Sequence, residues 1–141
     1  MQFITGGTFN GKSRWVKENI DREREWLKLF HSETMPHPAG YEGLVVMEGL
    51  EYLVLSELRK GRNGDDVRMD FLSLFLKWKS WEDVSANEII WIGSDISKGI
   101  VPIEAETRLW RDVTGWVYQD LVRESKEVYE IWFGLPTLLK G

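Results

Sequence analysis

The chain has 141 residues, a formal net charge of −5 and no cysteine. Its length predicts one domain over residues 1–141, and its 43% hydrophobic and 29% charged residues are ordinary for a globular protein. The lack of cysteine excludes disulfides and thiolate chemistry, and the acidic balance argues against nucleic acid as the main partner.

The first recognisable motif is a glycine-rich loop near the N-terminus. Residues 6–13 fit the phosphate-binding pattern G-x-x-x-x-G-K-[ST]. The apolar residues 1–4 before it predict a buried strand, and Val16 and Ile20 after it have the spacing of one helix face. Strand, glycine loop and helix is the context that this motif requires in P-loop nucleotide-binding proteins, so a chance glycine turn is the weaker interpretation.

Each residue type in this loop suits nucleotide binding. The predicted binding residues are Gly6, Gly7, Thr8, Phe9, Asn10, Gly11, Lys12 and Ser13. The glycines allow positive φ angles, so that backbone N–H groups can turn toward phosphate oxygens at the start of a helix. We expect Lys12 to reach the β- and γ-phosphates of GTP or ATP, and the hydroxyl of Ser13 to bind Mg²⁺.

The next segment predicts helices as far as residue 31. A first helix begins near Lys12 and extends into the charged run 21–25, whose alternating signs are typical of a solvated helix face. The apolar residues that follow predict a second helix, or a continuation of the first, over about residues 22–31. Prolines and a glycine then predict a loop over residues 31–40.

Residues 44–48 form an apolar run that ends in an acid, as expected of a buried parallel strand. Ligands of open α/β sheets bind at the carboxyl ends of the strands, so Glu48 is the expected second Mg²⁺ ligand beside Ser13. The alternative is a surface charge that caps the following helix. We favour the metal site, because a P-loop predicts such an acid.

The remaining chain alternates between helices and strands. Helices are expected over residues 50–60, 69–78 and 104–126, strands over 88–93 and 128–133, and residues 134–136 end the last strand. Gly115 interrupts the last helix at a cost of about 1 kcal/mol relative to alanine, which indicates close packing or a ligand. The expected fold class is α/β, with a P-loop NTPase-type mainly parallel sheet flanked by helices.

The last third of the chain carries a further set of motifs. They are Gly99-Ile100-Val101-Pro102, Arg108, Arg111-Asp112, Gly115, Gln119 and a Gly-x-Pro-x-x-Leu-Lys tail at residues 134–140. With residues 4–7 and 12–14, they resemble the adenosylcobinamide kinase/adenosylcobinamide-phosphate guanylyltransferase family of cobalamin salvage. The resemblance covers residues 1–20 and 44–141.

The resemblance implies a substrate and two reactions. Members of that family phosphorylate the aminopropanol hydroxyl of adenosylcobinamide with a nucleoside triphosphate, and then transfer a guanylyl group from GTP through a covalent histidine. It implies here an Mg²⁺-dependent kinase in which Lys12 and Glu48 are catalytic, and in which Glu48 or Asp95 orients the acceptor hydroxyl. Arg108 and Arg111 lie one helical turn apart and either reach phosphate or lie on a solvated face.

The sequence departs from the family pattern mainly between residues 20 and 44. Family members carry about thirty more residues, mostly in this segment, which holds further strands and the guanylylated histidine. Glu23, His31 and Pro36 keep the spacing of the family's acid, nucleophilic histidine and proline. His31 would then attack the α-phosphorus of GTP. Otherwise it caps a helix end or faces solvent. We favour this second role because the supporting strands are expected to be absent; His37 is a weaker rival nucleophile.

Three departures lie closer to the predicted site. Ser94-Asp95 replaces an Asn-Glu pair, Tyr118 replaces an asparagine, and Phe9-Asn10 replaces an Arg-Ser pair in the loop. The first hypothesis is therefore a kinase with guanylyl transfer reduced or absent. The second is a catalytically degenerate nucleotide-binding protein that acts as a regulator or partner, which the intact Lys12, Ser13 and Glu48 argue against.

Both hypotheses share expectations about location and assembly. No apolar run is long enough for a membrane span, and the N-terminus lacks the layout of a signal peptide, which predicts a cytoplasmic protein. The eight tryptophans and several apolar helices leave more apolar surface than a small sheet can cover. Since the family that the chain resembles is also oligomeric, we expect a homo-oligomer.

Overall fold

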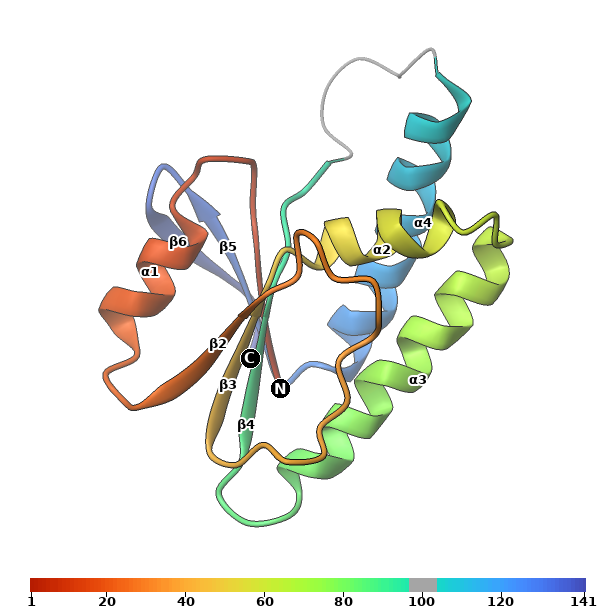
Figure 1. The fold of residues 1–141 in the computed structure, drawn as a ribbon. Helices are drawn as coiled ribbons and strands as arrows, with labels where there is room; N and C mark the ends of the chain where they lie inside the picture. The colour runs from red at the N-terminus through yellow and green to blue at the C-terminus, as the bar shows by residue number, and fades with distance from the viewer. Residues whose placement is uncertain (97–103) are drawn as a thin grey trace.

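A computed structural model of the chain describes residues 1–96 and 104–141 (Figure 1). Within these residues, one six-stranded sheet has the order β2-β3-β4-β1-β5-β6. The elements are β1 (Gln2–Thr5), α1 (Lys12–Asn19), β2 (Arg24–Lys28), β3 (Leu44–Glu48), α2 (Leu50–Leu58), α3 (Gly64–Glu82), β4 (Glu88–Ile92), α4 (Ala105–Glu124), β5 (Glu127–Trp132) and β6 (Leu135–Lys140). The predicted motif at residues 99–102 lies outside the described residues.

The sheet is mainly parallel and is covered by helices on both faces. β1 to β5 pair in parallel, whereas β6 runs antiparallel to β5. Figure 1 shows α1 on one face and α2, α3 and α4 on the other. The expected α/β class with a mainly parallel sheet is confirmed. Among the described helices, none combines the length and the apolar character needed to cross a membrane.

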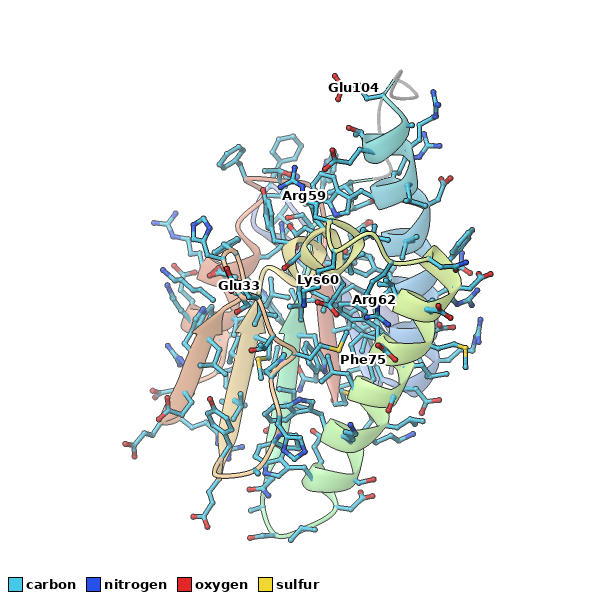
Figure 2. The ribbon with its side chains drawn as sticks, turned by 45° about the vertical axis from the view of Figure 1, so that its right-hand side comes forward. Glu33, Arg59, Lys60, Arg62, Phe75 and Glu104 are labelled. Carbon is cyan, nitrogen blue, oxygen red and sulfur yellow. The ribbon has the colours of Figure 1, made fainter. Side chains whose placement is uncertain are left out.

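Alternation along the central strands builds two hydrophobic cores. In β3, Val45 and Met47 join the larger cluster under α2, α3 and α4, while Leu44 and Val46 join the smaller cluster under α1. Successive side chains of a strand point to opposite faces, so a strand buried on both faces must be apolar throughout. Phe75 of α3, labelled in Figure 2, is fully buried in the larger cluster, with its ring centroid 5.2 Å from that of Trp91.

The segment after α1 is a strand, so the expected helix over residues 22–31 is wrong. β2 pairs with β3 in register from Arg24 opposite Leu44 to Lys28 opposite Glu48. It lies at the edge of the sheet, where its side chains are exposed or only partly buried, so the strand accommodates three charged residues. Pairing with β3 outweighs the local helical pattern. A supporting strand therefore precedes His31, contrary to the sequence-based expectation.

The opposite edge also differs from expectation, because the chain continues as a strand after residue 134. Phe133 and Gly134 have φ angles of 50° and 73°, as in the tight turns that join hairpin strands. β6 then pairs with β5, with Pro136 opposite Ile131. An edge strand tolerates a proline because one side of its backbone needs no partner.

An ion pair joins α3 to α4. Arg68 donates from Nε and Nη2 to the two carboxylate oxygens of Asp120, at 2.8 and 2.9 Å. The Asp120 side chain is 5% exposed and that of Arg68 is 34% exposed. The hydrogen bonds from Arg68 hold the pKa of Asp120 below its ordinary value.

We expect Asp120→Asn to lower the free energy of unfolding by about 1–3 kcal/mol near neutral pH, because the bidentate charged hydrogen bonds are lost. A carboxyl with a lowered folded-state pKa stabilises above its unfolded pKa, and this contribution disappears as the pH falls through the folded value. The difference between the variant and the unsubstituted protein should therefore shrink in acid. Urea unfolding at neutral pH and at about pH 3 measures both effects.

A matched control is available on the surface. Glu106 accepts from Arg59 at 2.7 Å, and both side chains are more than half exposed. Glu106→Gln should change the free energy of unfolding by no more than about 0.5–1 kcal/mol. Equal effects of the two substitutions near neutral pH would contradict the assigned role of Asp120.

Candidate functional site

The glycine-rich loop connects the end of β1 to the start of α1. Gly6 and Gly11 have positive φ angles of 139° and 85°. A Cβ atom on Gly6 would lie 2.2 Å from the backbone oxygen of Ile131, so only glycine fits at this position. Gly11 directly precedes α1, so the loop ends at the positive end of a helix dipole. This is the backbone arrangement that binds anions.

The hairpin between β5 and β6 supports this loop. The backbone N–H of Gly134 donates to the backbone oxygen of Asn10 at 2.9 Å, and the N–H of Phe133 donates to Asn10 Oδ1 at 3.2 Å. Asn10, which departs from the family pattern, thus bonds with both its backbone and its side chain. The turn that leads into β6, the strand that the sequence did not reveal, therefore helps to support the loop.

Six predicted site residues line one cavity of about 310 Å³ beside the loop: Thr8, Phe9, Gly11, Lys12, Ser13 and Glu48. The Ser13 hydroxyl donates to Glu48 Oε2 at 2.5 Å. The indole N–H of Trp26 donates to the other oxygen of Glu48 at 3.2 Å. Since β2 carries Trp26, the unexpected strand helps to orient the carboxylate.

Lys12 points its ammonium group at the loop. The residue is 8% exposed, and Nζ donates to the backbone oxygen of Gly7 at 2.9 Å. Burial lowers the pKa of Lys12, and the negative charges of Glu51 and Glu48 partly offset this effect. An ammonium group that has lost much of its water interacts strongly with an incoming phosphate.

Ser13 and Glu48 also fit a magnesium ion by the chemistry of their donors. Hydroxyl and carboxylate oxygens are hard ligands, and Mg²⁺ is usually held by one or two protein oxygens together with phosphate oxygens and water. Their direct hydrogen bond shows that the two oxygens meet at one point, although they come from α1 and from the end of β3.

His31 does not belong to this group of residues. It is exposed in the loop after β2, whereas its neighbour Phe30 lines the cavity and packs against Gly49. Farther along, the loop is bonded to the turn that follows α2, because Lys60 Nζ donates to the backbone oxygen of Glu33 at 2.7 Å; both residues are labelled in Figure 2. His37, the weaker rival, accepts through Nδ1 from the N–H of Ala39 at 3.1 Å.

Glu51 is a residue of the cavity that the sequence analysis missed. It lies in the first turn of α2 and is 4% exposed. Burial raises the pKa of Glu51, while hydrogen bonds from its own backbone and from Ser94, and the charge of Lys12, lower it. The one sequence signal that could have indicated Glu51 is its position three residues after Glu48. The first turn of a helix that follows a strand lies at the same edge of the sheet as the end of that strand.

The motif residues of α4 line a second cavity, of about 680 Å³. Arg111, Gly115 and Gln119 line it together with Asp95. A Cβ atom on Gly115 would have no atom of the described chain within 4 Å, so close packing does not explain the glycine. Asp95 joins this cavity to the loop, since its backbone N–H donates to the oxygen of Gly6 at 2.8 Å.

A glycine-rich loop between β1 and α1, in a mainly parallel sheet with an acid at the end of β3, defines an α/β protein of the P-loop NTPase type. Residues 21–139 match the family model described as cobinamide kinase/cobinamide phosphate guanyltransferase. The chain therefore belongs to this family of transferases of cobalamin biosynthesis, and the resemblance is confirmed. The match begins after the glycine-rich loop, which is identified by its own sequence and geometry. A search of curated proteins found no match.

We expect Lys12→Ala to weaken the binding of GTP or ATP in the presence of Mg²⁺ by roughly tenfold to a hundredfold, because it removes a charged hydrogen bond worth about 1.5–3 kcal/mol. Isothermal titration calorimetry measures the affinity. Lys17→Ala is the control, since Lys17 lies on the same helix but is exposed and stacks over Trp26. Equal nucleotide affinity of the two variants would refute the site.

Proposed function

We propose that this protein is a cobinamide kinase, which transfers the γ-phosphoryl group of GTP or ATP to the aminopropanol hydroxyl of adenosylcobinamide. The observation that supports it most is the hydrogen bond between Ser13 and Glu48 beside the buried Lys12, in a chain that belongs to the cobinamide kinase family. P-loop enzymes use a lysine, a hydroxyl and an acid of this kind for phosphoryl transfer.

Different residues of the site have different roles in the proposed phosphoryl transfer. Such enzymes act mainly by positioning the phosphates and by neutralising charge. Lys12 and the backbone of residues 6–13 hold the β- and γ-phosphates in this proposal. Ser13 and Glu48 would hold Mg²⁺, which would supply positive charge to neutralise the phosphate oxygens.

The test is an assay of the purified chain with Mg²⁺, GTP or ATP, and adenosylcobinamide, in which the products are resolved by mass spectrometry. The proposal requires a product heavier by one phosphoryl group, and Glu48→Gln should abolish its formation. Nucleotide binding without any such product would instead favour the second hypothesis, a catalytically degenerate nucleotide-binding regulator or partner.

We propose further that guanylyl transfer is reduced or absent. A histidine nucleophile must lie about 3–3.5 Å from the phosphorus on an aligned path. His31 is exposed, and among the described residues it is Phe30 rather than His31 that lines the cavity. β2 supports the segment before His31, although the short length of that segment led us to expect no strand there. The residue of this segment that bonds to Glu48 is Trp26 and not His31.

GTP labelled at the α-phosphate separates the two activities. After incubation and a quench in base, we expect little label on the chain while phosphorylated product still forms. His37→Ala is the matched control for His31→Ala. Acid-labile label that disappears in His31→Ala and persists in His37→Ala would show that the protein is a compact bifunctional enzyme.

Self-association is proposed on separate grounds. The β5–β6 hairpin exposes large apolar side chains, namely Trp132, Phe133, Leu135, Leu138 and Leu139, each at 44% or more of its surface. Large apolar side chains that gather on one exposed hairpin commonly mark a protein interface. Light scattering at micromolar concentration should give a mass that is a multiple of 16.5 kDa. A monomer mass would exclude this assembly.

A further inference from the structure

The proposed phosphoryl transfer assigns no role in binding phosphate or metal to one carboxylate of the cavity. Glu51 lines the cavity with Lys12, Ser13 and Glu48, and is 4% exposed. Among the described residues, its Oε1 atom is buried and has no hydrogen-bond partner. A buried polar atom without a partner costs about 1–3 kcal/mol, and native proteins keep few of them. Its retention beside Lys12 indicates a partner that arrives with the substrates.

Neighbouring elements hold this carboxylate in place. Ser94, which follows β4, gives it hydrogen bonds from its backbone and its side chain. The Tyr118 hydroxyl of α4 donates to the backbone oxygen of Ser94 at 2.8 Å. The Trp110 indole N–H donates to the backbone oxygen of Glu51 at 2.8 Å. Glu51 is thus fixed from α4 and from the end of β4.

The hydrogen bond between Tyr118 and Ser94 requires a glycine at position 93. A Cβ atom on Gly93 would lie 2.3 Å from the Tyr118 hydroxyl, so the tyrosine can reach Ser94 only because residue 93 is glycine. Ser94 and Tyr118 are two of the positions where the chain departs from the family pattern. In this chain both serve to position Glu51.

The chemistry of the substrates limits what Oε1 can bind. The phosphate oxygens of a nucleoside triphosphate accept hydrogen bonds and carry negative charge, so they cannot satisfy a carboxylate. Glu48 differs from Glu51 because both of its oxygens already accept, from Ser13 and Trp26. Asp95 lines the other cavity. A hydroxyl group brought by the phosphoryl acceptor can supply the donor that Oε1 lacks.

We propose that Glu51 is the general base of the reaction and that its Oε1 accepts the proton of the acceptor hydroxyl; this inference rests on the proposed kinase function. The acceptor oxygen forms a bond to the γ-phosphorus while the bond from that phosphorus to the β–γ bridging oxygen breaks. The nucleoside diphosphate leaves with the electron pair of the broken bond, and the hydroxyl proton passes to Glu51.

The test compares Glu51→Gln with the unsubstituted protein in two measurements. The affinity of the variant for GTP or ATP with Mg²⁺ should be unchanged. Glutamine keeps the shape of the side chain but replaces one carboxylate oxygen by an amide nitrogen, which cannot accept the proton. Its single-turnover rate of phosphoryl transfer to adenosylcobinamide should fall about 10²–10⁴-fold. Glu57→Gln is the control on the same helix, because Glu57 is also buried but pairs with Arg62, at 2.9 Å. It should keep the rate.

Chemical rescue separates a base from a structural carboxylate. Glu51→Ala removes the side chain beside the cavity, and added formate should restore part of the lost rate. An unchanged rate in Glu51→Gln would overturn the inference. So would a loss of Mg²⁺-dependent nucleotide affinity as large as that of Glu48→Gln, because it would make Glu51 part of the metal site.

Failure of the kinase proposal is distinguishable from failure of this inference. If the unsubstituted protein phosphorylates adenosylcobinamide and Glu51→Gln does so equally well, only the role of Glu51 is wrong. If the unsubstituted protein does not phosphorylate adenosylcobinamide, the proposed function is wrong, and hydrolysis of the nucleotide, with water as acceptor, tests Glu51. Loss of hydrolysis in Glu51→Gln would support the base, and an unchanged rate would overturn it.

Discussion

The contact between Ser13 and Glu48 joins parts of the sheet that do not pair with each other. Ser13 follows β1, Glu48 ends β3, and β4 lies between these two strands. Neighbouring strands are about 4.8 Å apart, so the two side chains meet across roughly two strand spacings. The contact therefore requires that β4 end before it reaches the space between the two side chains. β4 ends at Ile92, and the backbone N–H of the next residue, Gly93, donates to the backbone oxygen of Ile4.

The elements that the sequence revealed are those buried on both sides. β1, β3 and β4 are short apolar runs because each faces a hydrophobic core on both surfaces. The glycine-rich loop was also predictable from the sequence, because its glycines mark positions where the backbone needs positive φ angles. The geometry brings Lys12, Ser13 and Glu48 into one cavity, while their roles in binding and catalysis stay predictions.

The features that the sequence concealed depend on partners far along the chain. β2 and β6 are edge strands with exposed side chains, and only their pairing with β3 and β5 makes them strands. Glu51 reads as an ordinary acid in the first turn of a helix. It accepts hydrogen bonds from Ser94, which is held in turn by the hydroxyl of Tyr118. These two residues lie 43 and 67 positions later in the sequence, so no local pattern links them to Glu51.

The support of the glycine-rich loop by the β5–β6 hairpin has a consequence for how the protein is made. Gly6 lies against Ile131, and Asn10 binds Phe133 and Gly134, so the loop depends on residues that are synthesised long after it. Ribosomes add about 5–20 residues per second, so the loop waits on the order of ten seconds for its support. The glycine-rich loop therefore reaches its final form only after the β5–β6 hairpin has left the ribosome.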